Sequence, residues 1–387
     1  MVFKEFLVSF KNKISGNISK NKSIYFAMLA VIISACSVTL AVFESRNILI
    51  SEDITIEQPE TIQYDREEEL SQIVQQFEGI MMEDPGDVTP PLLLAPSVVI
   101  VEVGSEKVPG PTICIDDVDK SVECKVVGKY NLDAVGSYNL ERVATDSSGN
   151  SIRMSFTLKV VEKIDPLSED EERPVEPLDI QDAISMYSAP GATIGIDVSK
   201  WQGNVDWNKV AKSGVKFVMI RLGAQDGFHG ENTLDEYFIK NYEGARSAGL
   251  KIGVYYYSYA TSIEEAAQQG MYVVNTLKEK GYTLDLPIAY DWESWSRLSG
   301  LNMSLTDFNN CAKIFMETVE KAGYKSCLYS SKYYLENGLW TLSKRNLWLA
   351  HYIRQTTYTG KYMMWQCSCT GKVPGIYGFV DINVLYE

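Results

Sequence analysis

Two carboxylates, Asp291 and Glu293, lie one residue apart in the stretch PIAYDWESW (287–295), whose other residues are mostly apolar or aromatic. Burying a charge without a partner is costly. In a strand, residues i and i+2 point to the same face, roughly 6 to 7 Å apart. Two carboxylates in this arrangement can flank a sugar and cleave its glycosidic bond. One, protonated, helps the leaving oxygen depart, while the other, charged, stabilises the cationic sugar carbon.

The pair belongs to a C-terminal block, residues 191–387, in which apolar strand-like runs alternate with helical patterns. Such alternation predicts parallel strands joined by crossover helices, that is, an α/β fold of the TIM-barrel type. The last connections, after Tyr352 especially, are too short or irregular for full helices, so we expect a barrel that is incomplete at its end. The eight predicted strands are TIGIDVSK, KFVMIRLG, KIGVYYYSYA, LPIAYDWE, KSCLYSS, NLWLAHY, YMMWQCS and GFVDINVLY.

Further polar residues fall where the strands of such a barrel build its site, at their C-terminal ends. Asp197 ends the first strand and Asp381 lies in the eighth, so four acids from three strands should converge. Clustered like charges raise the pKa of one member, which suits it to donate a proton. Aromatic rings offer sugars flat apolar faces for stacking. The expected substrate-binding residues are Tyr257, Tyr259, Trp295, Tyr329, Tyr352, Trp365 and Gln366.

Acidic residues of this block also have structural interpretations, either in ion pairs or as helix caps. Arg221, on the second predicted strand, is the best partner for an ion pair with Asp291 and Glu293. Asp206 and Asp235 each precede a helical pattern, which makes them candidate helix caps. A metal site is not expected, because the chain has two histidines and no cysteine spacing that demands zinc.

Six motifs of this block resemble, in the same order, those of the glycoside hydrolase family 25 lysozymes, the N-acetylmuramidases of bacteria, phages and fungi. The resemblance covers residues 194–386. It implies a (β/α)5β3 barrel and hydrolysis, with retention, of the β-1,4 bond between N-acetylmuramic acid and N-acetylglucosamine. The motifs are GIDVSKWQGNVDW, FVMIRLG, IGVYYYSYA, PIAYDWE, LWLAHY and WQCS…GKVPGIYGFVDINV.

The resemblance also implies roles for the four acids. Glu293 matches the proton donor of the family. Asp291 matches the carboxylate that stabilises the cationic intermediate, with participation of the substrate's 2-acetamido group. Asp197 and Asp381 match two further acids of the pocket. No metal or organic cofactor is implied.

The N-terminal region predicts a membrane anchor. Residues 1–23 carry five lysines and one acid, and residues 24–43 form an uncharged apolar run of 20 residues. Such a run is long enough to cross a bilayer as a helix, and the lysines place the N-terminal tail in the cytoplasm. Everything after Phe43 is then expected outside the cell. The alternative is a lipobox that would make Cys36 a lipidated N-terminus.

The remaining segments predict a spacer between anchor and barrel. Residues 44–91 form an acidic stalk with a helical period over 65–82. Residues 92–162 contain short strand-like runs and resemble small bacterial immunoglobulin-like modules, whose last hairpin carries the pattern G-x-Y…A-T-D-x-x-G-N. The acidic, proline-containing residues 163–190 predict an extended linker.

Charge narrows the choice of partner. The net charge of −15 argues against nucleic acid, because binding phosphate requires a basic surface. The sequence therefore predicts a membrane-anchored, extracellular peptidoglycan hydrolase that faces the cell wall, with glycan strands as its partner and an unknown membrane complex as a second possible one. The alternative is a cell-wall glycan-binding or scaffold protein on the same fold, without catalysis.

Overall fold

The computed structural model describes residues 68, 70–75, 86–164, 176–342 and 345–386. The predicted anchor, residues 24–43, and most of the predicted stalk lie outside these residues. Within the described part of the chain, no helix is both long and apolar enough to cross a bilayer. Residues 70–75, inside the predicted stalk helix, are helical.

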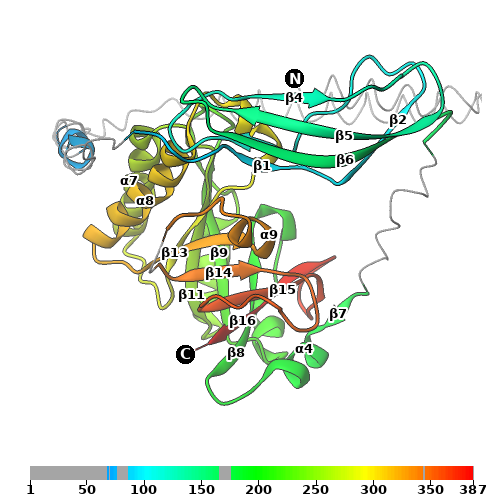
Figure 1. Ribbon diagram of the computed structural model, residues 1–387. Helices are drawn as coiled ribbons and strands as arrows, with labels where there is room; N and C mark the ends of the chain where they lie inside the picture. The colour runs from blue at the N-terminus through cyan, green and yellow to red at the C-terminus, as the bar shows by residue number, and fades with distance from the viewer. Residues whose placement is uncertain (1–67, 69, 76–85, 165–175, 343–344, 387) are drawn as a thin grey trace, which may run out of the picture. The chain divides into compact units, whose positions relative to one another are not determined.

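All eight strands predicted for the C-terminal block form, and they belong to one sheet (Figure 1). The seven strands from the first to the seventh are parallel neighbours. The eighth pairs antiparallel with both the seventh and the first, which closes the barrel. In chain order the strands are β8 (Ala192–Val198), β9 (Phe217–Gln225), β11 (Lys251–Tyr257), β12 (Ile288–Asp291), β13 (Ser326–Ser331), β14 (Leu347–Ala350), β15 (Met364–Lys372) and β16 (Val380–Tyr386).

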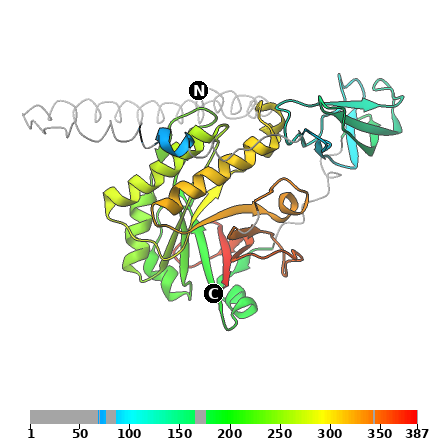
Figure 2. The same cartoon turned by 60° about the vertical axis from the view of Figure 1, so that its left-hand side comes forward.

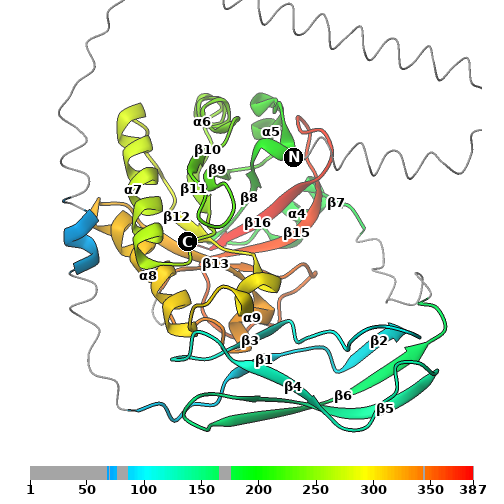
Figure 3. The ribbon, with the colours of Figure 1, turned by 90° about the horizontal axis from the view of Figure 1, so that it is seen from above.

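Helices follow the first five strands only, as the short later connections predict. Figure 3 shows the longer ones around the outside of the strands, and Figure 2 shows α7 and α8 packed against each other. Within the described residues, no helix separates β14, β15 and β16. The helices are α5 (Trp207–Lys212), α6 (Phe238–Ser247), α7 (Ile263–Lys280), α8 (Leu305–Lys321) and the short α9 (Lys332–Glu336).

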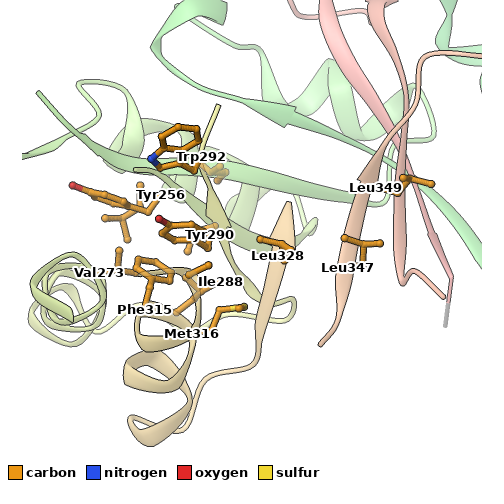
Figure 4. Packing of buried hydrophobic residues seen from close by; sticks show 14 of the residues in the cluster. Tyr256, Val273, Ile288, Tyr290, Trp292, Phe315, Met316, Leu328, Leu347 and Leu349 are labelled. Atoms are coloured by element: carbon orange, nitrogen blue, oxygen red, sulfur yellow. The ribbon is translucent and has the colours of Figure 1, made fainter. Parts of the chain in front are cut away.

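Side chains of the barrel strands alternate between its interior and the surrounding helices. On β12, Ala289 joins an interior cluster with Trp348, whereas Ile288 and Tyr290 pack outward against Phe315 of α8 (Figure 4). This period of two fixes which residues can reach the centre of the barrel.

The predicted linker is wrong over its second half. Leu178–Asp179 form β7, which pairs with β15, and Ile180–Tyr187 form α4. Asp179 caps this helix through its side chain, and Ile180 and Ala183 are fully buried. The composition of residues 163–190 as a whole is acidic and contains several prolines, so it gave no indication of a short amphipathic helix that packs on the barrel.

Residues 92–161 contain six strands in two sheets. The long hairpin of β5 (Gly136–Thr145) and β6 (Ser151–Val161) turns at Asp146–Asn150, where the Asp146 side chain accepts a hydrogen bond from the Asn150 amide. An immunoglobulin-like assignment of this region stays a prediction. A four-stranded sheet in the order β2 (Val98–Glu102), β6 (Ser151–Val161), β5 (Gly136–Thr145) and β4 (Glu123–Val127) accompanies an antiparallel pair of β1 (Leu92–Leu94) and β3 (Ile113–Ile115).

Candidate active site

A cleft of about 590 Å³ opens at the C-terminal ends of the parallel barrel strands. It gathers residues from strands that are far apart in the sequence, as expected for a barrel active site. All four predicted acids line it, together with five of the seven predicted substrate-binding residues. These nine are Asp197, Tyr257, Tyr259, Asp291, Glu293, Tyr329, Tyr352, Gln366 and Asp381.

Asp291 and Glu293 lie at the end of β12 and just beyond it. Trp292, between them, is fully buried on the helix side, so alternation turns both carboxylates into the cleft. Asp291 is only 5% exposed, and its Oδ1 is buried with no hydrogen-bond partner among the described residues. Glu293, by contrast, is exposed to solvent within the cleft. The two acids therefore differ in environment although they share a wall.

Asp197 and Asp381 face each other across the antiparallel β8–β16 pair. Two amides fix the Asp197 carboxylate, because the side chains of Gln366 and Asn383 both donate to its Oδ2 at 2.8 Å. Gln366 is oriented in turn by the hydroxyls of Tyr329 (2.8 Å) and Tyr352, which donate to its Oε1. Gln366 and Tyr329 thus hold a neighbouring acid in place as well as lining the cleft.

The charges of these acids interact. Burial raises the pKa of Asp291 well above the ordinary value, and the charges of Glu293 and Asp197 act in the same direction. Burial also raises the pKa of Asp381 to about 8 and that of Asp197 to about 6, although the two amides lower the latter. Enclosure in the cleft raises the pKa of Glu293, and the charge of Asp197 adds to this. The cluster therefore retains protons near neutral pH.

Arg221 forms no ion pair with Asp291 or Glu293, although its charge opposes the rise that burial causes in the pKa of Asp291. It forms a buried ion pair with Asp235, with the guanidinium Nη2 2.7 Å from the carboxylate Oδ2. Asp235 is not the N-cap of α6, which is Tyr237, but its Oδ1 accepts from the Tyr237 amide just before that helix. Its Oδ2 accepts from the Lys200 amide. Asp206 does cap α5, accepting from the Lys209 amide.

Two predicted substrate-binding residues lie elsewhere. Trp365 is 3% exposed and packs edge-on against Tyr187, and its indole donates to the His351 carbonyl. It cannot face the cleft, because its strand neighbour Gln366 already does. Trp295 stacks on Tyr334 and lines a second hollow of about 350 Å³. Glu293, Tyr329 and Tyr352 line both cavities.

Comparison with known proteins agrees with this geometry. The family profile described as glycosyl hydrolases family 25 matches residues 196–376. The uncharacterized protein YegX of Escherichia coli K12 is 31% identical over 194 residues, which are 49% of this chain and 68% of that protein. The chain belongs to glycosyl hydrolase family 25. Its barrel is accordingly a glycosidase of the lysozyme type.

Other proteins are similar to this chain over half of its length or more. The autolytic lysozyme of Clostridium acetobutylicum is 31% identical over 50% of this chain and 56% of its own length. Among solved structures, the modular autolysin LytC from Streptococcus pneumoniae, in complex with a synthetic peptidoglycan ligand, superposes with a TM-score of 0.46. It is 22% identical over 64% of this chain and 56% of that chain. The chain thus spans little more than half of these two proteins.

Two residues in or beside the cleft escaped the sequence analysis. Asn383 is fully buried and holds Asp197, and it lies two residues after Asp381 on β16, so strand alternation could have indicated it. Trp201 is 77% exposed on the cleft wall, with the Lys200 ammonium 5.2 Å from its ring centroid. A loop residue of this kind carries no periodic signal in the sequence.

The raised pKa values of the family 25 cleft predict a pH-dependent stability. Asp381 titrates at about 8 in the folded protein and near its ordinary 3.8 when unfolded, so the folded state binds this proton more tightly. Its contribution to stability is complete below pH 3.8 and is lost as pH rises to about 8. We expect the melting temperature to fall over this range, and the fall to be smaller in Asp381→Asn. A pH series of thermal unfolding measures this, with the exposed Glu236→Gln as a control that should keep the wild-type slope. A wild-type slope in Asp381→Asn as well would contradict the prediction.

Proposed function

We propose that this protein is a peptidoglycan hydrolase that cleaves the β-1,4 bond between N-acetylmuramic acid and N-acetylglucosamine. The observation that supports this most is the pairing of two unlike carboxylates on one wall, the buried Asp291 and the open Glu293. Family 25 relatives named autolytic lysozyme and Lysozyme M1 support the substrate class.

In this proposal Glu293 is the general acid. It is open to the cleft, so it can reach the glycosidic oxygen, and its raised pKa favours the protonated form that a leaving group needs. Binding of a sugar would remove further water from Glu293 and strengthen this effect.

Asp291 would act on the substrate's 2-acetamido group. Its buried Oδ1 lacks a donor among the described residues, and the N–H of an acetamido group would supply one. A hydrogen bond from this N–H would orient the acetamido carbonyl for attack on the sugar carbon. The positive charge that develops there would favour the ionised form of Asp291. Departure of the leaving group on one face and later attack of water on the same face give retention.

The direct test is digestion of purified peptidoglycan by the full chain in detergent, followed by borohydride reduction and mass spectrometry of the fragments. New reducing ends on muramic acid support the proposal, whereas new reducing ends on glucosamine would exclude this bond specificity. Sedimentation with peptidoglycan but no fragments, from wild type and Glu293→Gln alike, would instead favour the glycan-binding alternative.

Trp201 provides a test of sugar binding. Its exposed ring on the cleft wall can stack on a sugar, and burying roughly 20–60 Å² of apolar surface in such a contact is worth about 0.5–1.5 kcal/mol. We expect Trp201→Ala to raise KM about 2- to 10-fold with little change in kcat. Steady-state rates on soluble glycan fragments measure this. Tyr377→Ala is the control, because Tyr377 is 96% exposed but does not line the cleft, and an equal effect of both variants would remove Trp201 from the binding surface.

We further propose that residues 24–43 anchor the protein in the cell membrane as a single span, with the N-terminus in the cytoplasm and the barrel outside, toward the cell wall. The uncharged run of 20 residues after a lysine-rich tail supports this. A tether raises the local concentration near the wall, which charge attraction cannot do for a chain of net charge −15. Release of the full chain from washed membranes by high salt alone would contradict it.

A further inference from the structure

Three aspartates gather next to the two-stranded sheet, far from the barrel cleft in sequence. Asp87 precedes β1, and Asp116 and Asp117 follow β3 directly. One carboxylate oxygen from each lies within 4.8 Å of the others. No spacing motif marks this group, because 28 residues separate its first two members.

Each of these aspartates has a buried oxygen without a hydrogen-bond partner in the described part of the chain. The atoms are Oδ2 of Asp87, Oδ2 of Asp116 and Oδ1 of Asp117. Asp116 is fully buried, and its other oxygen accepts from the amides of Val118 (2.9 Å) and Asp119 (2.8 Å). The local turn therefore satisfies one side of the Asp116 carboxylate and leaves the other facing two more acids.

Basic residues do not compensate this group. Among the described residues, none of the ion pairs includes Asp87, Asp116 or Asp117. Burial raises the pKa of Asp116, and the charges of Asp117 and Asp87 act in the same direction. Unpaired buried carboxylates are costly, so the group requires either bound protons or a cation.

We propose that Asp87, Asp116 and Asp117 bind a divalent cation of the calcium type. The available ligands are all oxygens, which suits a hard cation better than zinc, whose structural sites use cysteine and histidine. Oxygens bound to one Ca²⁺ at 2.3–2.6 Å lie at most roughly 5 Å apart, which agrees with the 4.8 Å limit of this group. Backbone carbonyls and water can complete a shell of six to eight ligands.

The site would join three segments of the β-rich region. Asp87 lies before β1, and Asp116 and Asp117 lie between β3 and β4. The β5–β6 turn adjoins them, because the Asn150 side chain donates to the Asp87 carbonyl at 3.3 Å. Asp146 of that turn also has a buried oxygen, Oδ2, without a partner in the described region. A bound cation would therefore stabilise the packing of the segment before β1 against the two loops. This effect does not depend on the proposed hydrolase activity.

The test uses the full chain in detergent, treated with EDTA and then dialysed. Isothermal titration calorimetry with CaCl2 measures binding, and thermal unfolding with and without CaCl2 measures the effect on stability. We expect saturable binding with a Kd of about 1 mM or tighter and a rise in melting temperature. Asp116→Asn should weaken binding about tenfold or more, because affinity depends on the number of charged ligands. Asp133→Asn removes an exposed acid from the same region and should bind as wild type does.

Three results would overturn the proposal. The first is the absence of saturable heat when wild type is titrated with millimolar CaCl2. The second is loss of calcium binding in Glu293→Gln but not in Asp116→Asn, which would place the calcium in the barrel. The third is a rise in the melting temperature of Asp116→Asn in EDTA while calcium changes nothing, which would show that the group holds protons. If Asp116→Asn does not fold, Asp117→Asn, at a partly exposed position, gives the same comparison.

Discussion

We expect Glu293→Gln to lower kcat for peptidoglycan hydrolysis by about 10²- to 10⁴-fold, the usual contribution of a general acid. The amide keeps the shape of the side chain but cannot release a proton to the leaving oxygen. Because Glu293 is exposed within the cleft, the melting temperature should stay within about 1 °C of wild type. Release of reducing ends over time, beside thermal unfolding of the same samples, measures both quantities.

Glu236→Gln is the matched control, because it makes the same chemical change at an exposed position outside the cleft. It should retain wild-type activity. Full activity of Glu293→Gln would exclude Glu293 from the reaction, whichever of the two roles it has. Asp291 is the competing candidate for the acid, because burial disfavours the charge of Asp291 more strongly than that of Glu293. The Glu293 assignment therefore requires substrate to shift the proton toward it.

The alternation of side chains between the two faces of a strand made the site predictable from the sequence. Once PIAYDWESW is interpreted as a strand end, a period of two places Asp291 and Glu293 on one face and Trp292 on the other. The structure has this arrangement, although regular pairing of β12 ends at Asp291. The same rule would have removed Trp365 from the predicted substrate-binding residues, because its neighbour Gln366 was assigned to the cleft. It would also have placed Asn383 on the same face of the strand as Asp381.

Features that depend on tertiary contacts could not be predicted in this way. Asp235 contacts Arg221 of β9 and the amide of Lys200 after β8, and nothing local distinguishes it from a helix cap. The amphipathic α4 (Ile180–Tyr187) was hidden because its acidic, proline-rich surroundings dominate the average composition. Both errors come from local patterns that were interpreted without the surface on which they pack.

The second large effect concerns Asp291, for which activity and stability should change in opposite directions. In the proposed mechanism Asp291→Asn removes the charge that stabilises the cationic intermediate, so we expect kcat to fall about 10²- to 10⁴-fold. The same substitution removes a buried ionisable group with an unpartnered oxygen, so it should raise the melting temperature by about 2–4 °C for each kcal/mol gained. The gain should grow as pH rises, because the unfolded chain then ionises Asp291 freely, whereas the folded state must keep its proton or bury its charge.

Asp197→Asn is the informative comparison for this prediction. Asp197 is equally buried, but two amide donors already stabilise its charge, so its replacement should give a smaller gain in melting temperature or none. Rates and unfolding curves of both variants at several pH values separate the cases. An Asp291→Asn variant that is both inactive and less stable than wild type would mean that Asp291 supports the fold of the β12 end. Loss of activity with a gain in stability requires instead that the protein keeps this charge for its chemistry.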